Sequence, residues 1–311
     1  VTTTESAGHR QTLPSSPWPA GEEQALQRLE TFACEIVGDY ERHRNFPAVD
    51  GTSRLSPYLG LGMLSGRQCF TAAQDALQHQ PHARQGIECW INELIWRDFY
   101  IHILHHFPRV SMHRAFKPET DALPWRGDGP ALQAWSDGRT GIPIVDAAMR
   151  QLRHCGWMHN RLRMICAMFL TKNLFVDWRL GERFFMRHLV DGYLPANNGG
   201  WQWSASTGTD AAPYFRIFNP VAQSEKFDPH GVFLRHYLPE LAGRDDRSIH
   251  QPLQRALVGV DYPLPIVDLA TSRREAIAIF AASGGRSAHR TGSLFDEPEG
   301  TEFTSERIED Q

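Results

Sequence analysis

Residues 195–220 combine residue types that suit a binding site for a flat ligand. The run contains two tryptophans, Trp201 and Trp203, a pair of asparagines and a pair of glycines, and it is almost uncharged. Glycines beside a tryptophan let the backbone approach a large flat molecule, and a second ring two residues later points elsewhere. A core helix rarely has this composition. The run therefore indicates either a site for a planar ligand or a loop held in place by two aromatic side chains.

A second set of residues follows one stripe of a helix predicted over residues 88–106. The stripe consists of Trp90, Glu93, Trp96 and Arg97. Helical spacing places these side chains one above another. Two interpretations remain open. Glu93 pairs with Arg97 across one turn between core tryptophans, or Glu93 accepts hydrogen bonds from a ligand in an aromatic pocket.

Another predicted helix, over residues 159–174, carries a third set of residues on one face. Asn160, Arg163 and Met164 are three and four residues apart, and Trp157 lies close to them in the chain. We expect Asn160 to be buried on this face. A buried amide is costly unless its hydrogen bonds are satisfied, so the pattern favours a ligand held by Asn160.

Residues 50–57 consist of turn formers and small hydroxyl residues. The centre of this segment is Thr52, Ser53, Arg54, Leu55 and Ser56. Backbone N–H groups and three hydroxyls within five residues suit phosphate oxygens, and they equally suit an ordinary helix cap. The glycines of residues 60–66 imitate a dinucleotide-binding fingerprint, but the third glycine is misplaced and no strand precedes it, so we discard that interpretation.

Other patterns exclude several classes of protein. The histidines at positions 102, 105, 106 and 113 have no carboxylate or cysteine at helical spacing, so we expect a half-solvated surface and no metal site. Five cysteines without close pairing argue against a disulfide framework and favour a reducing compartment. No apolar run has the roughly 18 residues that a membrane span needs, and we expect a cytoplasmic protein.

The net charge conceals a local basic excess. The chain has 311 residues, 41% of them hydrophobic, which fits one large domain or two small ones. Its formal charge is −4. Residues 284–311 hold three arginines against seven acidic residues, so this segment alone accounts for the net negative charge. Between Arg150 and Lys226, ten basic residues outnumber five acidic ones. This section predicts a surface for phosphate backbones or, alternatively, solvated helix faces with ion pairs.

The predicted architecture is one mainly α-helical domain over residues 20–283. Apolar residues recur at helical spacing from residue 22 to 43, and we predict further helices over residues 65–77, 144–155 and 181–189, with almost no strand alternation. Residues 1–19 are predicted to be a linker remnant, and residues 284–311 a disordered acidic tail. We expect a fragment whose upstream part is missing.

Five motifs in this order strongly resemble the DNA photolyase and cryptochrome family, and class I cyclobutane pyrimidine dimer photolyases within it. The resemblance extends from about residue 22 to about residue 281. The motifs are Tyr40 with residues 44–56, then residues 90–100, 140–150, 156–164 and 197–203.

The resemblance implies an all-helical domain that holds FAD in a U shape. It also implies that an N-terminal α/β antenna domain is missing here, so we expect no antenna pigment in this chain. The residues implied to surround FAD are Tyr40, Thr52, Ser53, Arg54, Leu55, Ser56, Trp90, Asn160, Arg163, Asp191, Tyr193 and Asn197. Asn197 would face flavin N5. Family members usually have aspartate where this chain has Tyr193, so the flavin contact at that position is uncertain.

The implied activity is that of a carbon–carbon lyase acting on damaged DNA, with reduced FADH⁻ as the active cofactor in a monomer. The residues implied to line the dimer pocket are Glu93, Trp96, Asn160, Met164 and Trp203. The residues implied to contact DNA are Arg44, Glu93, Arg97, Asn160, Arg161, Arg216 and Gln223. The residues implied to relay electrons to the flavin are Trp201, Trp178 and Trp125. Excited reduced flavin would supply the electron that splits the dimer, so no acid, base or nucleophile needs to stand out.

Two positions distinguish relatives of this family. Photolyases for (6-4) lesions carry histidine where this chain has Asn160, and plant cryptochromes carry aspartate where it has Asn197. Both residues favour repair of cyclobutane dimers. The alternative is a cryptochrome-type blue-light receptor that binds FAD without repair and uses the acidic tail to bind a partner.

Overall fold

The computed structural model describes residues 17–210, 216–252 and 262–282. Residues 1–16 of the predicted linker, the predicted acidic tail and residues 211–215 of the aromatic run lie outside these ranges. The predicted domain boundaries therefore stay predictions.

Within the described ranges the chain is helical, and its only extended pairing is an isolated bridge between Arg126 and Val176. The prediction of a mainly α fold is confirmed. The α-helices are α1 (Glu22–Thr31), α2 (Tyr40–His43), α3 (Ser56–Gly60), α4 (Gly66–His79), α5 (Arg84–His106), α6 (Pro130–Ser136), α7 (Pro143–Cys155), α8 (Asn160–Met168), α9 (Trp178–His188), α10 (Leu194–Ser204), α11 (Pro220–Phe227), α12 (Val232–Tyr237) and α13 (Leu269–Ala282).

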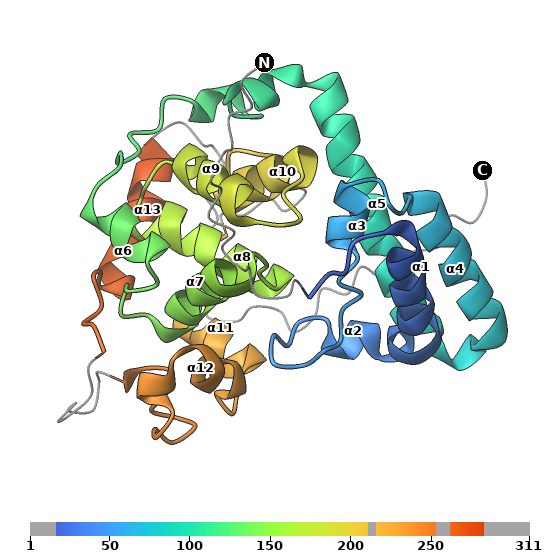
Figure 1. Cartoon of the computed structure of the whole chain (residues 1–311). Coiled ribbons are helices and arrows are strands. Elements are labelled where there is room, and N and C mark those ends of the chain that lie inside the picture. The colour runs from blue at the N-terminus through green and yellow to red at the C-terminus, as the bar shows by residue number, and fades with distance from the viewer. Residues whose placement is uncertain (1–16, 211–215, 253–261, 283–311) are drawn as a thin grey trace, which may run out of the picture.

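Two hydrophobic cores organise these helices (Figure 1). The first lies among α1 to α5 and includes Phe32 and Trp90. The second lies among α6 to α13 and is centred on the fully buried Trp135. Helix α5 belongs to the first group and continues until it packs against α10 of the second. The two groups are therefore held together by one long helix and its contacts.

Most predicted helices are present, with ends shifted by a few residues. Two of them change their helical type. The predicted helix over residues 22–43 contains α1, a π-helical turn (Phe32–Ile36), a 3-10 turn (Val37–Asp39) and α2. The predicted helix over residues 159–174 is α8 followed by a second π-helical turn (Phe169–Asn173). Trp157 precedes α8 and is not part of it. Apolar spacing predicts the buried face but not these local changes in winding.

The aromatic run was the main error in secondary structure. We expected no core helix there, but residues 194–204 form α10. Pro195 lies in the first turn, where its missing N–H costs no hydrogen bond. Gly199 packs so closely on the ring of Tyr100 that a Cβ at this position would overlap it. Packing against α5 thus outweighs the low helix propensity of two glycines.

A buried carboxylate fixes the start of α7. Asp146 is fully buried and accepts hydrogen bonds from the backbone N–H and hydroxyl of Thr140 (2.7 and 2.6 Å) and from the N–H of Gly141 (3.0 Å). The hydroxyl of Tyr262 donates a fourth hydrogen bond at 2.6 Å. Through Asp146, the network joins the segment before α7 to Tyr262, which lies 116 positions after Asp146 in the chain.

Replacing Asp146 by asparagine should lower the free energy of unfolding by about 1–3 kcal/mol, because an amide cannot accept every hydrogen bond of the carboxylate and leaves a buried donor unsatisfied. Urea titration followed by circular dichroism measures this change. The conservative control is Tyr262→Phe, which removes one donor and should cost less. Equal stability of Asp146→Asn and the wild type would contradict this interpretation of the network.

Candidate functional site

The predicted site residues gather where the first group of helices faces α8 and α10 (Figure 1). Helix α2, the loop over residues 52–56 and α5 supply one side. Helix α8, the segment before α10 and α10 itself supply the other. Helix α10 contacts both α5 and α8, so residues more than 100 positions apart in the chain are brought together.

Glu93 is paired, but not with the partner that helical spacing suggested. Its carboxylate lies 2.8 Å from the guanidinium of Arg44, and both side chains are half-buried. Arg97 instead donates to the carbonyl of Leu59 at 3.3 Å and lies 4.8 Å from the centre of the Tyr193 ring. The interpretation of a Glu93–Arg97 surface pair is therefore wrong. Arg44 and Glu93 form one charged unit in the site.

Arg163 and Asp191 form a second pair, which is more deeply buried. One guanidinium nitrogen donates to both carboxylate oxygens of Asp191, at 3.0 and 2.8 Å, and Arg163 Nε donates to the carbonyl of Met158 at 2.7 Å. The Asp191 side chain is only 2% exposed. A carboxylate this deeply buried needs such a partner. The pair therefore joins α8 to the segment that leads into α10.

In the loop over residues 52–56, two backbone carbonyls accept hydrogen bonds from side chains, whereas two backbone N–H groups have no partner among the described residues. Arg28 Nε donates to the carbonyl of Ser53 (3.1 Å), and Trp18 Nε1 donates to that of Arg54 (2.9 Å). Arg54 has a φ of +51°. Within the part of the chain that the structure describes, the backbone N–H groups of Ser53 and Arg54 have no hydrogen-bond partner.

The interpretation of this loop as an ordinary helix cap is wrong. Helix α3 begins after Leu55, which supplies no side-chain cap. The hydroxyl of Ser53 instead accepts a hydrogen bond from the Leu55 N–H at 3.4 Å, and Leu55 itself is buried. The remaining N–H groups are suited to anionic oxygens.

Two further N–H donors lie beside this loop, and neither was predicted as a site residue. Arg54 lies 5.5 Å from the centre of the Trp157 ring, and the rings of Trp157 and His159 are 6.3 Å apart and perpendicular. Both side chains are buried, and Trp157 Nε1 and His159 Nε2 have no hydrogen-bond partner among the described residues. An unsatisfied buried donor costs about 1–3 kcal/mol, so both nitrogens fit an acceptor on a ligand.

The protonation state of His159 follows from its surroundings. Burial lowers the pKa of His159 to about 3, and the charges of Arg161 and Arg163 contribute. The ring is therefore neutral near pH 7. Its Nδ1 accepts a hydrogen bond from the Arg161 N–H at 3.2 Å, which leaves the proton on Nε2. This geometry makes Nε2 a donor that has no acceptor among the described residues.

Aromatic packing fixes Tyr40 and Trp90. Both are buried, and their rings lie 5.8 and 4.9 Å from that of Phe32, with edge-on geometry. Burial raises the pKa of Tyr40, and the carboxylate of Glu93 raises it further, so the phenol stays protonated. These two residues form a rigid wall beside the Arg44–Glu93 pair.

The two adjacent asparagines of α10 have different partners. Asn197 Nδ2 donates to the carbonyl of Glu182 at 3.1 Å, which fixes the orientation of its amide. Asn198 donates to the Glu182 carboxylate (2.8 Å) and accepts from Gln202 Nε2 (3.0 Å). Burial raises the pKa of Glu182. Asn198 therefore secures α10 to α9, while Asn197 keeps its own carbonyl oxygen for another partner.

The residues predicted to line the dimer pocket include exposed aromatic surface. Trp96 is 49% exposed, and Trp203 is half-buried with Arg216 lying 5.6 Å from the centre of its ring. Asn160 is exposed, so the prediction that it is buried is wrong. Its amide lies 4.0 Å from the sulfur of Met164. Accessible indole surface is what a stacked base would need.

The predicted DNA-contacting residues are unequally exposed. Arg161 donates to Asn45 at 2.8 Å and lies 4.3 Å from the centre of the Phe227 ring, so it links the two helix groups. Gln223 is only 7% exposed, and its Oε1 has no hydrogen-bond partner among the described residues. Of these two, only Arg161 presents a charged group close to solvent.

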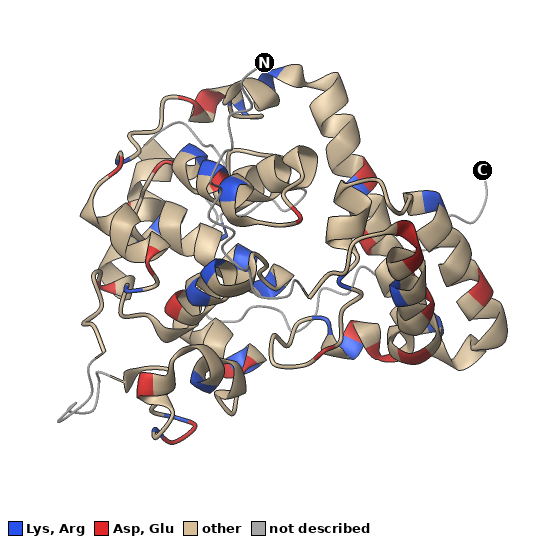
Figure 2. Cartoon of the chain, viewed as in Figure 1, with Lys and Arg blue, Asp and Glu red and all other residues tan. Residues whose placement is uncertain are grey.

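The basic excess is only partly a surface feature. Figure 2 shows basic residues on α8 and α9. Lys172, however, is buried in the second core, where it donates to the carbonyl of Ala205 (3.1 Å) and the hydroxyl of Ser206 (2.8 Å). Arg163 and Arg179 are held in ion pairs. The count of ten basic residues therefore overestimates the charge that faces solvent.

One of the three predicted relay tryptophans belongs to α9, and the other two lie beside its first turn. Trp178 begins this helix, and Trp201 packs against Gly181, one turn later. The Arg126–Val176 bridge brings Trp125 beside the segment that leads into Trp178. Trp201 and Trp125 therefore both lie near the first turn of α9, and the order of the relay stays a prediction.

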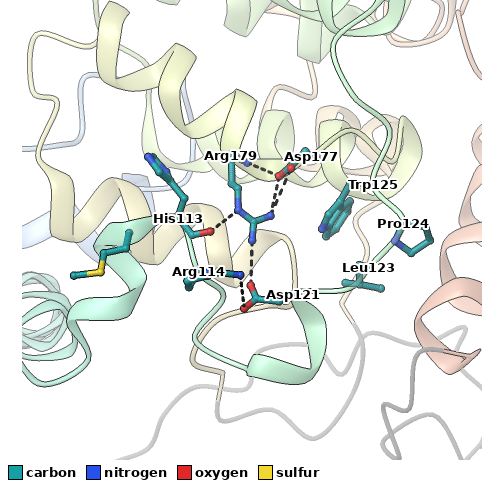
Figure 3. Close-up of a pocket in the computed structure, with 9 residues that line it drawn as sticks. His113, Arg114, Asp121, Leu123, Pro124, Trp125, Asp177 and Arg179 are labelled. Carbon is teal, nitrogen blue, oxygen red and sulfur yellow. Dashed lines mark hydrogen bonds and ion pairs between the residues drawn. The ribbon is translucent and has the colours of Figure 1, made fainter.

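Trp125 is the most exposed of the three tryptophans. Trp201 and Trp178 are buried, whereas Trp125 is half-buried and stacks on Phe175 at 4.7 Å. Trp125 also lines a pocket of about 510 Å³ that it shares with Arg179 and Asp121 (Figure 3). Of the three indoles, Trp125 is therefore the one that lies near the surface.

Among the described residues no cluster of three or more histidine, cysteine or carboxylate groups could hold a metal ion. Of the histidines at positions 102, 105, 106 and 113, those at 102 and 106 stack on each other, with ring centres 6.2 Å apart. None of the helices in the described ranges is both long and apolar enough to cross a membrane.

Sequence reasoning missed His159 and Gly181 as site residues, and it named Trp157 only as a neighbour of Asn160. Trp157 and His159 flank Met158 just before a predicted helix, and two aromatic residues there gave no chemical signal by themselves. Their importance comes from unsatisfied nitrogens, which only the packing reveals. Gly181 lies three residues after Trp178, a spacing that the sequence does contain.

The low pKa of His159 predicts a specific pH dependence. Between pH 6.5 and about 3 the unfolded chain binds a proton at this residue that the folded chain excludes, so stability falls as the pH falls. From pH 7 to pH 5 the wild type should lose about 2 kcal/mol more than His159→Gln. Urea titrations at several pH values measure the difference. Parallel curves for the two proteins would contradict a buried, neutral His159.

Comparison with known proteins gives a consistent result. The profile of the FAD binding domain of DNA photolyase matches residues 90–282. A deoxyribodipyrimidine photo-lyase of Escherichia coli (strain K12) is 52% identical over 279 residues, which are 88% of this chain and 58% of that protein. This chain therefore spans a little over half the length of that relative.

Two solved structures are also similar. A bacterial class III photolyase from Agrobacterium tumefaciens has a TM-score of 0.81 at 41% identity, covering 87% of this chain and 59% of its own. A Synechocystis cryptochrome has a TM-score of 0.80 at 35% identity, covering 85% of this chain and 56% of its own. On these matches, the chain belongs to the DNA photolyase family, and the matched part is its FAD-binding domain.

Proposed function

We propose that this chain binds FAD and uses light to split cyclobutane pyrimidine dimers in DNA. The observation that carries this proposal is the pair of accessible indoles, Trp96 on the same helix as Glu93 and Trp203 on α10, which packs against that helix. A site that bound only FAD would have no need of an indole with half its surface in solvent. The class I assignment rests on the sequence motifs and on Asn160, which occupies the position of histidine in (6-4) photolyases.

The residues present fit FAD. The open amides of Ser53 and Arg54 suit its phosphates, and the donors Trp157 Nε1 and His159 Nε2 suit acceptor atoms of the same ligand. The buried Arg163–Asp191 pair and Asn197 would hold the flavin end. Reduced FAD, when bound, supplies on illumination the electron that opens the cyclobutane ring and recovers it afterwards.

The protein itself binds and orients the lesion. A cyclobutane dimer pairs and stacks poorly, so moving it out of the helix costs less than moving normal bases. Trp96 and Trp203 would stack on the extruded dimer, and each such contact contributes about 1–3 kcal/mol. Glu93 would hydrogen-bond the bases. Because Arg44 is already bound to Glu93, it would keep that carboxylate oriented.

The charged residues near the rim would hold the DNA backbone. Arg97, Arg161 and Arg216 each lie against an aromatic ring, at 4.8, 4.3 and 5.6 Å from its centre. These stacked guanidinium groups are oriented before DNA arrives, which reduces the entropy lost on binding. We infer that the chain acts on DNA as a monomer.

A cryptochrome-type receptor that binds FAD without repair is the second candidate. The similarity to the Synechocystis cryptochrome structure favours it to the extent that the fold is shared. The accessible indoles favour repair, since signalling through FAD alone does not require them. Dimer repair therefore separates the two candidates.

Trp203→Ala should weaken binding to dimer-containing oligothymidylate by about 1–3 kcal/mol, because one stacking surface is lost. Illuminated with reduced FAD, the variant should also repair dimers more slowly at low DNA concentration. The matched control is Phe70→Ala, which removes an exposed aromatic ring from α4, outside the site. Equal affinities for all three proteins would contradict a stacking role for Trp203.

Trp125→Phe should separate cofactor reduction from repair. The phenyl ring still stacks on Phe175 but is much harder to oxidise than indole, so light-driven reduction of oxidised FAD should be lost. Repair by enzyme whose FAD has been reduced chemically should stay at the wild-type rate. Absorbance of the bound flavin follows the first reaction, and loss of dimers follows the second. Photoreduction at the wild-type rate in Trp125→Phe would show that Trp125 is not part of the electron relay.

A further inference from the structure

Gly181 permits a contact that no other residue could make. A Cβ at this position would overlap Cη2 and Cζ3 of the Trp201 indole and would lie 2.7 Å from Cδ2 of Leu170. The edge of the indole therefore rests directly on the backbone of α9. Gly181 lies inside the helix, where glycine costs about 1 kcal/mol relative to alanine, so its presence needs a reason such as this contact.

The contact holds Trp201 on the face of α9 that also carries Trp178 and Phe185. Trp178 lies three residues before Gly181, and Phe185 lies four residues after it. The Phe185 ring is 5.0 Å from the Trp201 ring, with perpendicular planes. Positions three and four residues apart lie on one face of a helix. Gly181 is therefore the point on α9 against which Trp201 is held, one turn away from Trp178.

Not every glycine near the site has this role. A Cβ at Gly200, the residue next to Trp201, would meet open space. Gly199 is as tightly packed as Gly181, but against the ring of Tyr100 on α5. The chain thus provides a matched pair of glycines, each in contact with one aromatic ring, of which only Gly181 contacts a predicted relay residue.

We propose that Gly181 is a positioning residue that sets the separation between Trp201 and Trp178 and thereby the rate of electron transfer between them. This inference rests on the proposed electron relay. After Trp201 has given one electron towards the cofactor, one electron moves from Trp178 to Trp201 and one from Trp125 to Trp178. A dissolved thiol then returns one electron to Trp125.

The chemical reason is the distance dependence of electron transfer. Transfer between two rings slows steeply as the gap between their edges widens. Any side chain at position 181 must move the indole away from α9, because the rigid ring cannot fold aside. Even a small displacement should therefore slow the step from Trp178 to Trp201 while leaving both residues in place.

The contact is tested first in the protein without cofactor, by a double-mutant cycle on the free energy of unfolding. Gly181→Ala should be strongly destabilising in the wild type and much less so in Trp201→Phe, because phenylalanine lacks the two atoms that the new Cβ would overlap. The matched cycle pairs Gly199→Ala with Trp201→Phe. These two changes should be nearly additive, since Gly199 contacts Tyr100. Additivity in the Gly181 cycle would overturn the proposal.

The second test measures the relay. In Gly181→Ala loaded with oxidised FAD, photoreduction by a dithiol should be at least about tenfold slower than in the wild type per bound flavin. Repair by the chemically reduced variant should continue. A merely structural role would lower stability but leave the photoreduction rate of the folded, flavin-bound protein unchanged, and that result would overturn the proposal.

Two further outcomes are distinguishable. If Gly181→Ala does not fold, recovery of folding and flavin binding in Gly181→Ala/Trp201→Phe would support the contact, and equal failure of the double variant would overturn it. If the chemically reduced wild type repairs no dimers, the proposed function fails, while the photoreduction rates of wild type and Gly181→Ala still decide the role of Gly181.

Discussion

The contact between α5 and α10 is the constraint on which the rest of the site depends. Helix α5 carries Glu93 and Trp96, and α10 carries Asn197, Trp201 and Trp203. The two helices belong to different hydrophobic cores and meet where the Tyr100 ring lies against Gly199. Burial raises the pKa of Tyr100 to about 12, with help from the carboxylates of Asp210 and Glu93, so its phenol stays neutral. The spacing between the proposed flavin and lesion contacts is set here.

Two polar contacts beside this boundary provide further order. Arg44 and Glu93 are paired within the first group, and Arg161 of α8 donates a hydrogen bond to Asn45 across the boundary. Beside the loop over residues 52–56, the groups without a partner in the described ranges are N–H groups, at residues 53 and 54 and on Trp157 and His159. A site whose free groups are donors prefers a ligand rich in acceptors, such as a dinucleotide with two phosphates. The polarity of the site thus agrees with the family to which the chain belongs.

The sequence predicted the fold class, most helices and many of the residues that lie close together in the site. These features depend on apolar periodicity and on long motifs, and both can be seen in a single sequence. It did not predict α10, since two glycines and two asparagines disfavour a helix until Tyr100 and Glu182 are there to pack and bond with them. It placed Asn160 in the interior, whereas this residue is exposed at the start of α8. Partners such as Arg44 for Glu93 and Gly181 for Trp201 depend on tertiary contacts, which one sequence does not encode in any local pattern.

The most direct test of the account is the return of thymine absorbance when the chain, loaded with chemically reduced FAD, is illuminated together with dimer-containing oligothymidylate. The account predicts recovery in the light and none in a matched dark sample. Unchanged dimers in the light, while the flavin remains reduced and the DNA remains bound, would contradict it.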